Sequence, residues 1–241
     1  MTTTHAITQP RTRVRKVLRA LSVGGILLAV IGVVSHFAWK NSGSNTWKLE
    51  IAKNGIEVYS LKAPGVSLKQ FRAVTRVNTT VTRAVAAMRD TGAAACADWL
   101  PGCASDQIVD PWNTRELYEV HLWHMNFPRP LTHREFLLKT LFTPEPPNKT
   151  VRVEFVALPD RLPRNACCFR VSDMHNSWRF TATGENEIEV ESVQNMDVGL
   201  PYFLYNAAAP QGIYQLFRKL PALLNKEKYR DAKFEFLDAA W

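Results

Sequence analysis

Hydrophobic and polar side chains alternate along the central part of the chain, a pattern typical of β-strands that bury one face. In residues 151–157 the apolar positions that alternate with charged ones are Val151, Val153, Phe155 and Ala157. In residues 134–142 one face carries Phe136, Leu138, Thr140 and Phe142. Similar patterns, separated by turn-rich stretches such as TPEPPN and PDRLPRN, extend from residue 114 to residue 197. Together they predict an antiparallel sheet with one dry side.

Two longer segments have helical spacing instead. After two short strands expected at residues 56–64 and 67–78, residues 79–100 place apolar side chains three and four apart and begin with a threonine that can cap a helix. Residues 201–224 are strongly apolar and rich in alanine and aromatics, and Pro210 is expected to break or kink this helix. The order of elements predicts an α+β domain whose final helix covers the dry face of a curved antiparallel sheet.

The N-terminal region has the pattern of a membrane span. Residues 20–39 contain no Asp, Glu, Lys or Arg, and twenty helical residues are about 30 Å long, the thickness of the hydrocarbon core of a bilayer. Trp39 and Lys40 lie where interfacial anchors are expected. Basic residues precede the span, which predicts a single-pass inner-membrane protein with a cytoplasmic N-terminus and an exported domain. The alternative is a cleaved signal peptide and a periplasmic protein, although the apolar run is longer than a signal peptide needs.

These patterns divide the chain into five parts. They are a basic cytoplasmic N-terminus (residues 1–19), a transmembrane helix (20–39), a polar linker (40–46), a folded domain (47–224) and a C-terminal tail (225–241). The 241 residues have a formal charge of +8, but five of the 30 basic side chains and none of the 22 acidic ones fall within residues 1–39. The remainder has 25 basic against 22 acidic side chains, which argues against nucleic acid as a partner.

The four cysteines fit an exported domain, because disulfides persist outside the cytoplasm. Cys96 and Cys103 bracket the short loop ADWLPG and are the pair expected to form a disulfide. Cys167 and Cys168 are adjacent, and in a strand their side chains would point to opposite faces, so two packed thiols are expected there. No C-x-x-C or nearby histidine indicates zinc.

No sequence motif marks an active site. The sequence has no nucleophile elbow, zinc-protease helix, P-loop or dinucleotide-binding glycine motif. His121 and His124 resemble a metal-binding pair, but residues i and i+3 of a strand project to opposite faces, so a shared metal is not expected. The predictions are therefore no catalytic residue, no metal and no cofactor.

The stretch NFPRPLTHREF, residues 126–136, is either a catalytic loop or a structural corner. Pro128 and Pro130 cannot donate a hydrogen bond to the middle of a sheet, so they mark a turn between strands. Arg134 and Glu135 are neighbours and would face opposite sides of a strand, each with a partner of its own. We interpret the stretch as a structural corner.

Several segments, taken in order, resemble one family: the START (steroidogenic acute regulatory protein-related lipid transfer) domains, in particular the bacterial members. The corner resembles the family's Pro-x-Pro-x-x-x-Arg-Asp motif with Glu135 in place of Asp, and NSWRF resembles its Gly-x-Trp strand with Asn176 in place of Gly. MDVGLPYFLYN resembles Asp-Pro-Gly-Gly-x-Leu-Pro-x-x-x-x-Asn, with Val198 in place of Pro. CADWLPGC and the opening strands are also similar, so the resemblance covers nearly all of residues 45–224.

The resemblance implies a helix-grip fold, in which the curved sheet wraps around the long C-terminal helix and leaves an apolar cavity. The positions expected in this cavity are His121, Trp123, Met125, Phe136, Leu138, Thr140, Phe155, Trp178, Phe180 and Tyr205. A lid hinge is expected around Asn206, Pro210 and Gly212. The implied ligand is a lipid or sterol, bound without chemical change for transfer or sensing at a membrane bilayer, by a protein expected to be a monomer.

Two other functions stay open on the sequence. One is an aromatase/cyclase-like enzyme of the same broad fold, with His121 or Glu119 as acid or base. The other is a structural module whose pocket is filled by its own side chains. A plugged cavity would favour the structural module, whereas a product that depends on His121 would favour the enzyme.

Overall fold

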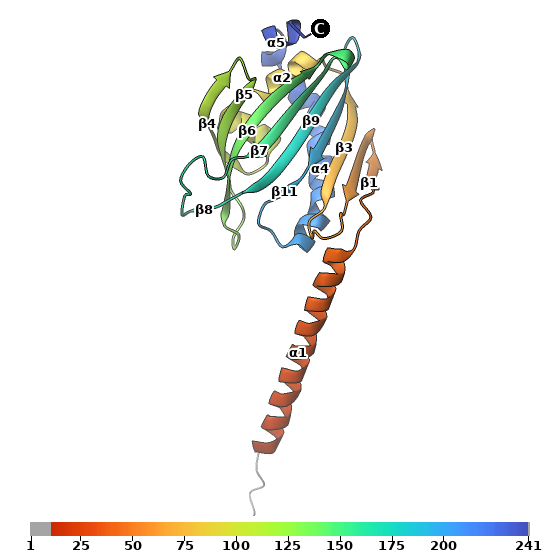
Figure 1. Ribbon diagram of the computed structural model, residues 1–241, viewed down its shortest axis with the longest axis vertical. Coiled ribbons are helices and arrows are strands. Elements are labelled where there is room, and N and C mark those ends of the chain that lie inside the picture. Colours follow the sequence, from red (N-terminus) through yellow and green to blue (C-terminus); the bar gives the residue numbers. More distant parts are fainter. Residues whose placement is uncertain (1–10, 241) are drawn as a thin grey trace, which may run out of the picture.

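Strands dominate the computed structural model of the protein, which describes residues 11–240. They are β1 (Lys48–Lys53), β2 (Ile56–Leu61), β3 (Gln70–Val77), β4 (Cys103–Asn113), β5 (Tyr118–Met125), β6 (His133–Glu145), β7 (Thr150–Ala157), β8 (Cys168–Arg170), β9 (Asp173–Gly184), β10 (Glu187–Gln194) and β11 (Met196–Asp197). The sheet has the order β1-β2-β3-β10-β9-β7-β6-β5-β4, with β11 beside β9 and the short β8 parallel to β6. It is curved, and α4 (Tyr202–Leu224) runs along its inner face (Figure 1). The predicted fold class is confirmed.

The alternating pattern of the central strands sorts their side chains as predicted. In β7 Val153 is fully buried, and in β6 Phe142 is 1% exposed. The outer face of β6 is also buried at Glu135 and Leu137, because residues 158–170 fold back over it. The sheet therefore has a dry inner face and a second covered patch at the start of β6.

The first predicted helix is two helices. α2 (Val81–Met88) begins after Thr80, whose hydroxyl accepts a hydrogen bond from the Arg83 amide at 3.3 Å, the cap expected from the sequence. α3 (Ala93–Trp99) begins after Gly92, whose φ of +96° is strained for any other residue. A single helix over residues 79–100 is therefore wrong: the apolar spacing continues, but the backbone at Gly92 is not helical.

α4 is one continuous helix, although Pro210 and Pro221 lie inside it. A proline within a helix removes a hydrogen bond and costs about 3 kcal/mol. The buried side of α4 offsets this cost, since Phe217, Leu220 and Leu224 are at most 1% exposed. The predicted break at Pro210 is therefore wrong, because packing against the sheet keeps the helix intact.

The residues predicted as a C-terminal tail belong to the folded domain. They form η2 (Glu227–Tyr229) and α5 (Glu235–Asp238), at the end of the domain opposite the N-terminal helix (Figure 1). Leu237 is 2% exposed, and the Tyr229 hydroxyl donates to the Asp90 carboxylate at 2.6 Å. The boundary predicted at residue 224 lies too early, because these residues complete the packing of the core.

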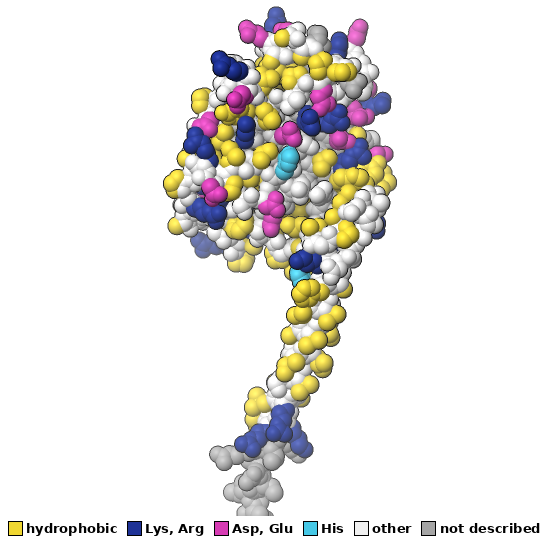
Figure 2. All heavy atoms as spheres, viewed as in Figure 1, with side chains coloured by type: hydrophobic (Ala, Val, Ile, Leu, Met, Phe, Trp, Pro, Cys, Tyr) yellow, Lys and Arg dark blue, Asp and Glu magenta, His cyan; other side chains and the backbone are white. Residues whose placement is uncertain are grey.

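α1 (Arg11–Asn41) is a single helix that projects from the domain (Figure 1). Its segment Val14–Asn41 is long and apolar enough to cross a membrane. Figure 2 shows hydrophobic side chains along this helix and basic ones near its free end. The structure therefore contains the predicted apolar helix, extended at both ends beyond residues 20–39. The first ten residues of the predicted cytoplasmic segment lie outside the described residues.

The end of α1 packs directly onto the domain. The Trp39 indole donates to the Ser67 carbonyl at 2.8 Å and stacks on Tyr202 of α4, with ring centroids 6.2 Å apart. The segment predicted as a linker is also held, since the Lys62 ammonium donates to the Ser42 carbonyl at 2.9 Å. These contacts join the apolar helix to the first turn of α4 without a loose tether.

The structure pairs all four cysteines. The predicted disulfide joins Cys96 of α3 to Cys103, the first residue of β4. Cys167 and Cys168 form a second disulfide, so the expectation of two packed thiols is wrong. That expectation assumed a strand through both residues, but β8 begins at Cys168 and Cys167 lies in the preceding turn. Outside a regular strand the two side chains are free to face one another.

Candidate functional site

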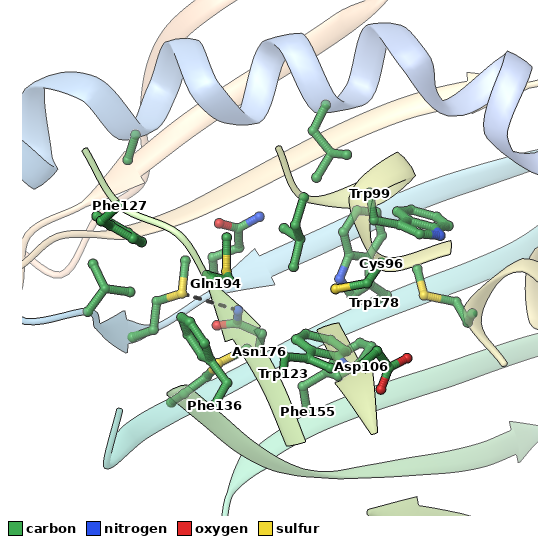
Figure 3. A pocket seen from close by; sticks show the side chains of 18 of the residues that line it. Cys96, Trp99, Asp106, Trp123, Phe127, Phe136, Phe155, Asn176, Trp178 and Gln194 are labelled. Atoms are coloured by element: carbon green, nitrogen blue, oxygen red, sulfur yellow. Dashed lines mark hydrogen bonds between the residues drawn. The ribbon is translucent and has the colours of Figure 1, made fainter. Parts of the chain in front are cut away.

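An apolar cavity lies between α4 and the inner face of the sheet. Its volume is about 350 Å³, within the range of small-molecule sites. Strands β5, β6, β7 and β9 and helices α2, α3 and α4 all contribute side chains to it (Figure 3). Six predicted cavity residues line it: Trp123, Met125, Phe136, Phe155, Trp178 and Tyr205. This open volume contradicts the alternative of a pocket filled by its own side chains.

Four predicted cavity residues lie elsewhere in the core. Leu138 and Phe180 are fully buried in its packed part, and Thr140 is 1% exposed. His121 is 4% exposed and bonds to carboxylates beside the cavity without lining it. The alternation of a strand predicts which face a side chain takes, but not where along that face the helix and the sheet separate.

Sequence reasoning missed most of the opposite wall. Its residues come from helices and loops without a strand pattern: Met88, Trp99, Leu100, Phe127, Val198, Leu200 and Leu216. Trp99 packs edge-on against Trp178, with ring centroids 5.8 Å apart (Figure 3). The sequence CADWLPGC could have indicated this wall, because Trp99, which lies between the two paired cysteines, lines the cavity.

A buried histidine with two carboxylates lies next to the cavity. The Nδ1 atom of His121 is 2.8 Å from Oδ1 of Asp106, and its Nε2 is 3.3 Å from Oε1 of Glu119. Burial alone would lower the pKa of His121, but the hydrogen bond to Asp106 and the nearby Glu119 carboxylate outweigh it and raise the pKa to about 9. Both ring nitrogens are engaged, so this arrangement offers neither as an acid or base to a ligand in the cavity.

We expect His121 to make stability depend on pH. A folded-state pKa raised above the unfolded value contributes about 1–3 kcal/mol of stability that is present below about pH 6.5 and lost as the pH rises through about 9. The urea midpoint of the full chain should therefore fall across this range, and His121→Gln should flatten the fall. If the midpoints of variant and wild type fall in parallel, another group is responsible.

Comparisons with known proteins agree with this architecture. No protein-family model matches the sequence. The chain is 24% identical over 186 residues to an uncharacterized protein of Pseudomonas aeruginosa, covering 74% of this chain and 84% of that protein. Among solved structures it is similar to a STAR-related lipid transfer protein from Xanthomonas axonopodis, with a TM-score of 0.66, 21% identity, and coverage of 75% of this chain and 99% of that one. The chain has the START fold.

A human protein with the same fold is more distant in sequence. The StAR-related lipid transfer protein 5 has a TM-score of 0.62 at 13% identity, and the match covers 83% of this chain and 95% of that one. Both START structures match nearly their whole length, so the shared part is the domain and not one motif.

The corner predicted from the START resemblance holds one wall of the cavity in place. The Nε atom of Arg134 donates to the Val198 carbonyl at 2.7 Å, and its Nη2 donates to the Gly199 carbonyl at 3.2 Å. Its guanidinium lies over the rings of Phe127 and Phe169, 4.5 and 5.3 Å from their centroids. A Cβ at Gly199 would lie 2.8 Å from the Phe169 ring, so the segment around this glycine is closely packed. Arg134 thus fixes the segment whose Val198 lines the START cavity.

Glu135 and Arg134 face opposite sides of β6, as predicted. The Glu135 carboxylate accepts from Nε of Arg170 at 2.6 Å and lies 3.0 Å from Nε2 of His124. The side chains of Glu135 and Arg170 are at most 2% exposed. Pro128 and Pro130 lie in the turn before β6, and Pro130 follows a cis peptide bond. The geometry of this START corner is that of a structural joint.

The predicted lid hinge lies in the first half of α4. Asn206 accepts from the Lys69 amide at 2.9 Å and donates to the Ser67 carbonyl at 3.0 Å, so it ties the helix to the loop before β3. Pro210 and Gly212 lie within the continuous helix. A hinge at these residues of the START domain remains a prediction.

Proposed function

We propose that the protein binds a hydrophobic ligand, a lipid or sterol, in its internal cavity and transfers or senses it at a membrane without chemical change. The observation that carries the proposal is the apolar cavity of about 350 Å³ between α4 and the sheet. The START fold supports it, because the two solved structures described above are named as lipid transfer proteins. We expect the domain to act as a monomer.

The length and apolar character of α1 support the proposal that it anchors the protein in the inner membrane as a single span, with the N-terminus in the cytoplasm and the domain exported. The two disulfides support an oxidising compartment for the domain. The contacts of Trp39 with Tyr202 and Ser67 favour an uncleaved anchor, because they make the end of α1 part of the packing of the domain. A cleaved periplasmic form remains the alternative.

Apolar side chains surround the place where α1 joins the domain. Phe203 and Leu204 of α4 are 61% and 50% exposed, and Val66 in the loop before β3 is 47% exposed. Trp39 contacts both segments, so these side chains lie close to the end of the apolar helix. Tyr205, the next residue of α4, lines the cavity. We infer that this apolar surface rests in the bilayer interface and that the ligand passes between membrane and cavity beside α4.

Such an arrangement would lower the barrier to moving a lipid. Each CH₂ group exposed to water costs about 0.8 kcal/mol, so spontaneous desorption from a bilayer is slow. An apolar cavity beside the membrane replaces water with a second apolar environment. Because α1 would keep the domain at the surface, the ligand and the cavity would meet at a high effective concentration.

The test is lipid mass spectrometry of the purified full chain. A fragment of residues 1–46, purified in the same mild detergent, controls for lipids that merely surround the membrane helix. We expect one lipid class to be enriched with the full chain, at about one molecule per protein, and to be chemically unaltered. Identical lipid profiles for the two preparations, together with no lipid uptake by the full chain from vesicles, would contradict the proposal.

A further inference from the structure

The part of the cavity wall formed by the described residues carries no cationic side chain. Among the described residues that line it, none is Lys, Arg or His. Its two acidic members already have partners: Asp106 is bonded to His121, and Asp90 accepts from the Tyr229 hydroxyl. The cations beside these two carboxylates, His121 at Asp106 and Lys228 at Asp90, are already engaged in those pairs. An anionic group brought into this cavity would therefore lose its hydration and find no free positive partner among the described residues of the wall. Burying an unpaired charge is far more costly than burying an uncharged polar group.

Two side chains of the wall have hydrogen-bond capacity that the protein leaves unused. The indole Nε1 of Trp123 and the hydroxyl of Tyr205 are both buried, and neither has a hydrogen-bond partner in the described chain. Trp123 lies on β5 and Tyr205 on α4, so the two groups come from opposite walls. An indole N–H only donates, and burial raises the pKa of Tyr205 so that its hydroxyl stays protonated.

Two amide side chains, Asn176 and Gln194, also line the cavity, and that of Asn176 differs from the Trp123 and Tyr205 groups. The Asn176 carbonyl oxygen accepts from the Asn195 amide at 2.8 Å, and its amide nitrogen donates to the sulfur of Met196, the dashed line in Figure 3. Its polar atoms are therefore already engaged within the protein. Because buried donors without acceptors are rare in folded proteins, the unpaired donors of Trp123 and Tyr205 indicate that the missing acceptors arrive with a ligand.

We propose that the cavity selects an uncharged lipid whose polar group accepts hydrogen bonds, such as a hydroxyl, ester or carbonyl, over any lipid with an anionic head group. This inference rests on the proposed function, since it names the chemistry of the ligand for the same cavity. Trp123 and Tyr205 orient the acceptor, and the apolar remainder of the wall takes the hydrocarbon. The absence of a cation on the wall excludes the anionic lipids.

Three photoreactive probes with the same chain and the same mid-chain diazirine test the inference: a methyl ester, an alkyl sulfate and an alkane. Each is added to phosphatidylcholine vesicles that contain the full chain, and labelling of β5 and β9 is divided by labelling of α1. The ratio corrects for the amount of probe in the bilayer. We expect the ester to label the strands at least about tenfold more than the sulfate.

Substitutions then assign the donors. Trp123→Phe and Tyr205→Phe each remove one donor and keep a ring, and each should lower ester labelling about tenfold while the alkane, which has no acceptor, changes less than about twofold. Tyr59→Phe, the same change on a tyrosine of β2 outside the cavity, should leave all three probes unchanged. Equal labelling by sulfate and ester, or no effect of either cavity substitution, would overturn the inference and leave the proposed function standing. Labelling of α1 alone by all three probes would overturn the proposed function itself.

Discussion

Replacing Arg170 with methionine will lower the free energy of unfolding by about 3–5 kcal/mol. The guanidinium pairs with the Glu135 carboxylate at 2.6 Å, and both side chains are almost fully buried. It also donates to the carbonyls of Pro159, Leu162 and Pro163, at 2.9, 3.3 and 3.1 Å. The variant therefore leaves the buried Glu135 carboxylate with only the half-buried His124 beside it, and three carbonyls without a donor.

A second arginine of the same segment is the matched control. Arg161 pairs with Asp110 at 3.0 Å, but their side chains are 53% and 29% exposed, so Arg161→Met should cost at most about 1 kcal/mol. The double variant Glu135→Met/Arg170→Met should lose less stability than Arg170→Met alone, because the buried carboxylate that lost its arginine is removed as well. Urea unfolding of the full chain measures all three. Equal midpoints for Arg170→Met and Arg161→Met would show that the buried pair does not hold the segment.

The contacts of Arg134 and Glu135 show which part of this structure could be predicted from the sequence and which part could not. The adjacency of Arg134 and Glu135 in a strand predicts that they face opposite sides and find separate partners, and they do. Their partners lie in residues 158–170 and 197–201, segments without a regular period. The spacing of apolar residues indicates the local geometry of the backbone. How the irregular segments fold back over β6 depends on tertiary packing, which this spacing does not indicate.

For the candidate site, too, some residues were predicted from the sequence and others were not. Strand alternation and the START resemblance place Trp123, Phe155 and Trp178 on the inner face, and these residues line the cavity. The same reasoning places Phe180 there, but Phe180 is fully buried in the packed core. β9 carries both Trp178 and Phe180, and α2 packs against β9 and β7. Where helices fill the curve of the sheet the core is closed, and where they diverge a cavity remains.

The corner, the cavity and the apolar helix meet at one end of the domain. Arg134 bonds the segment at Val198, which lines the cavity and leads into α4. The first turn of α4 contacts Trp39 through Tyr202, and Asn206 ties the next turn to the loop that Trp39 also contacts. A change in how α1 sits in the bilayer would therefore act on the same residues that border the cavity.

Filling the cavity from α4 should abolish ligand binding while the fold survives. Ala209 is half-buried and lines the cavity, so Ala209→Phe projects a ring into the space of about 350 Å³ that a ligand would occupy. We expect the lipid that co-purifies with the full chain to fall at least about tenfold, a loss of about 1.4 kcal/mol or more in binding free energy. Because the ring enters open space, the change in unfolding free energy should stay within about 1–3 kcal/mol.

Ala207→Phe makes the same substitution on the exposed side of the same helix, outside the cavity lining, and should leave lipid binding intact. Lipid mass spectrometry of the two variants, with urea unfolding as the check on folding, separates occlusion of the cavity from general damage to α4. If Ala209→Phe retains as much lipid as Ala207→Phe, the ligand lies outside this cavity. In that case the exposed apolar surface around Phe203 and Leu204 is where the lipid would have to be bound.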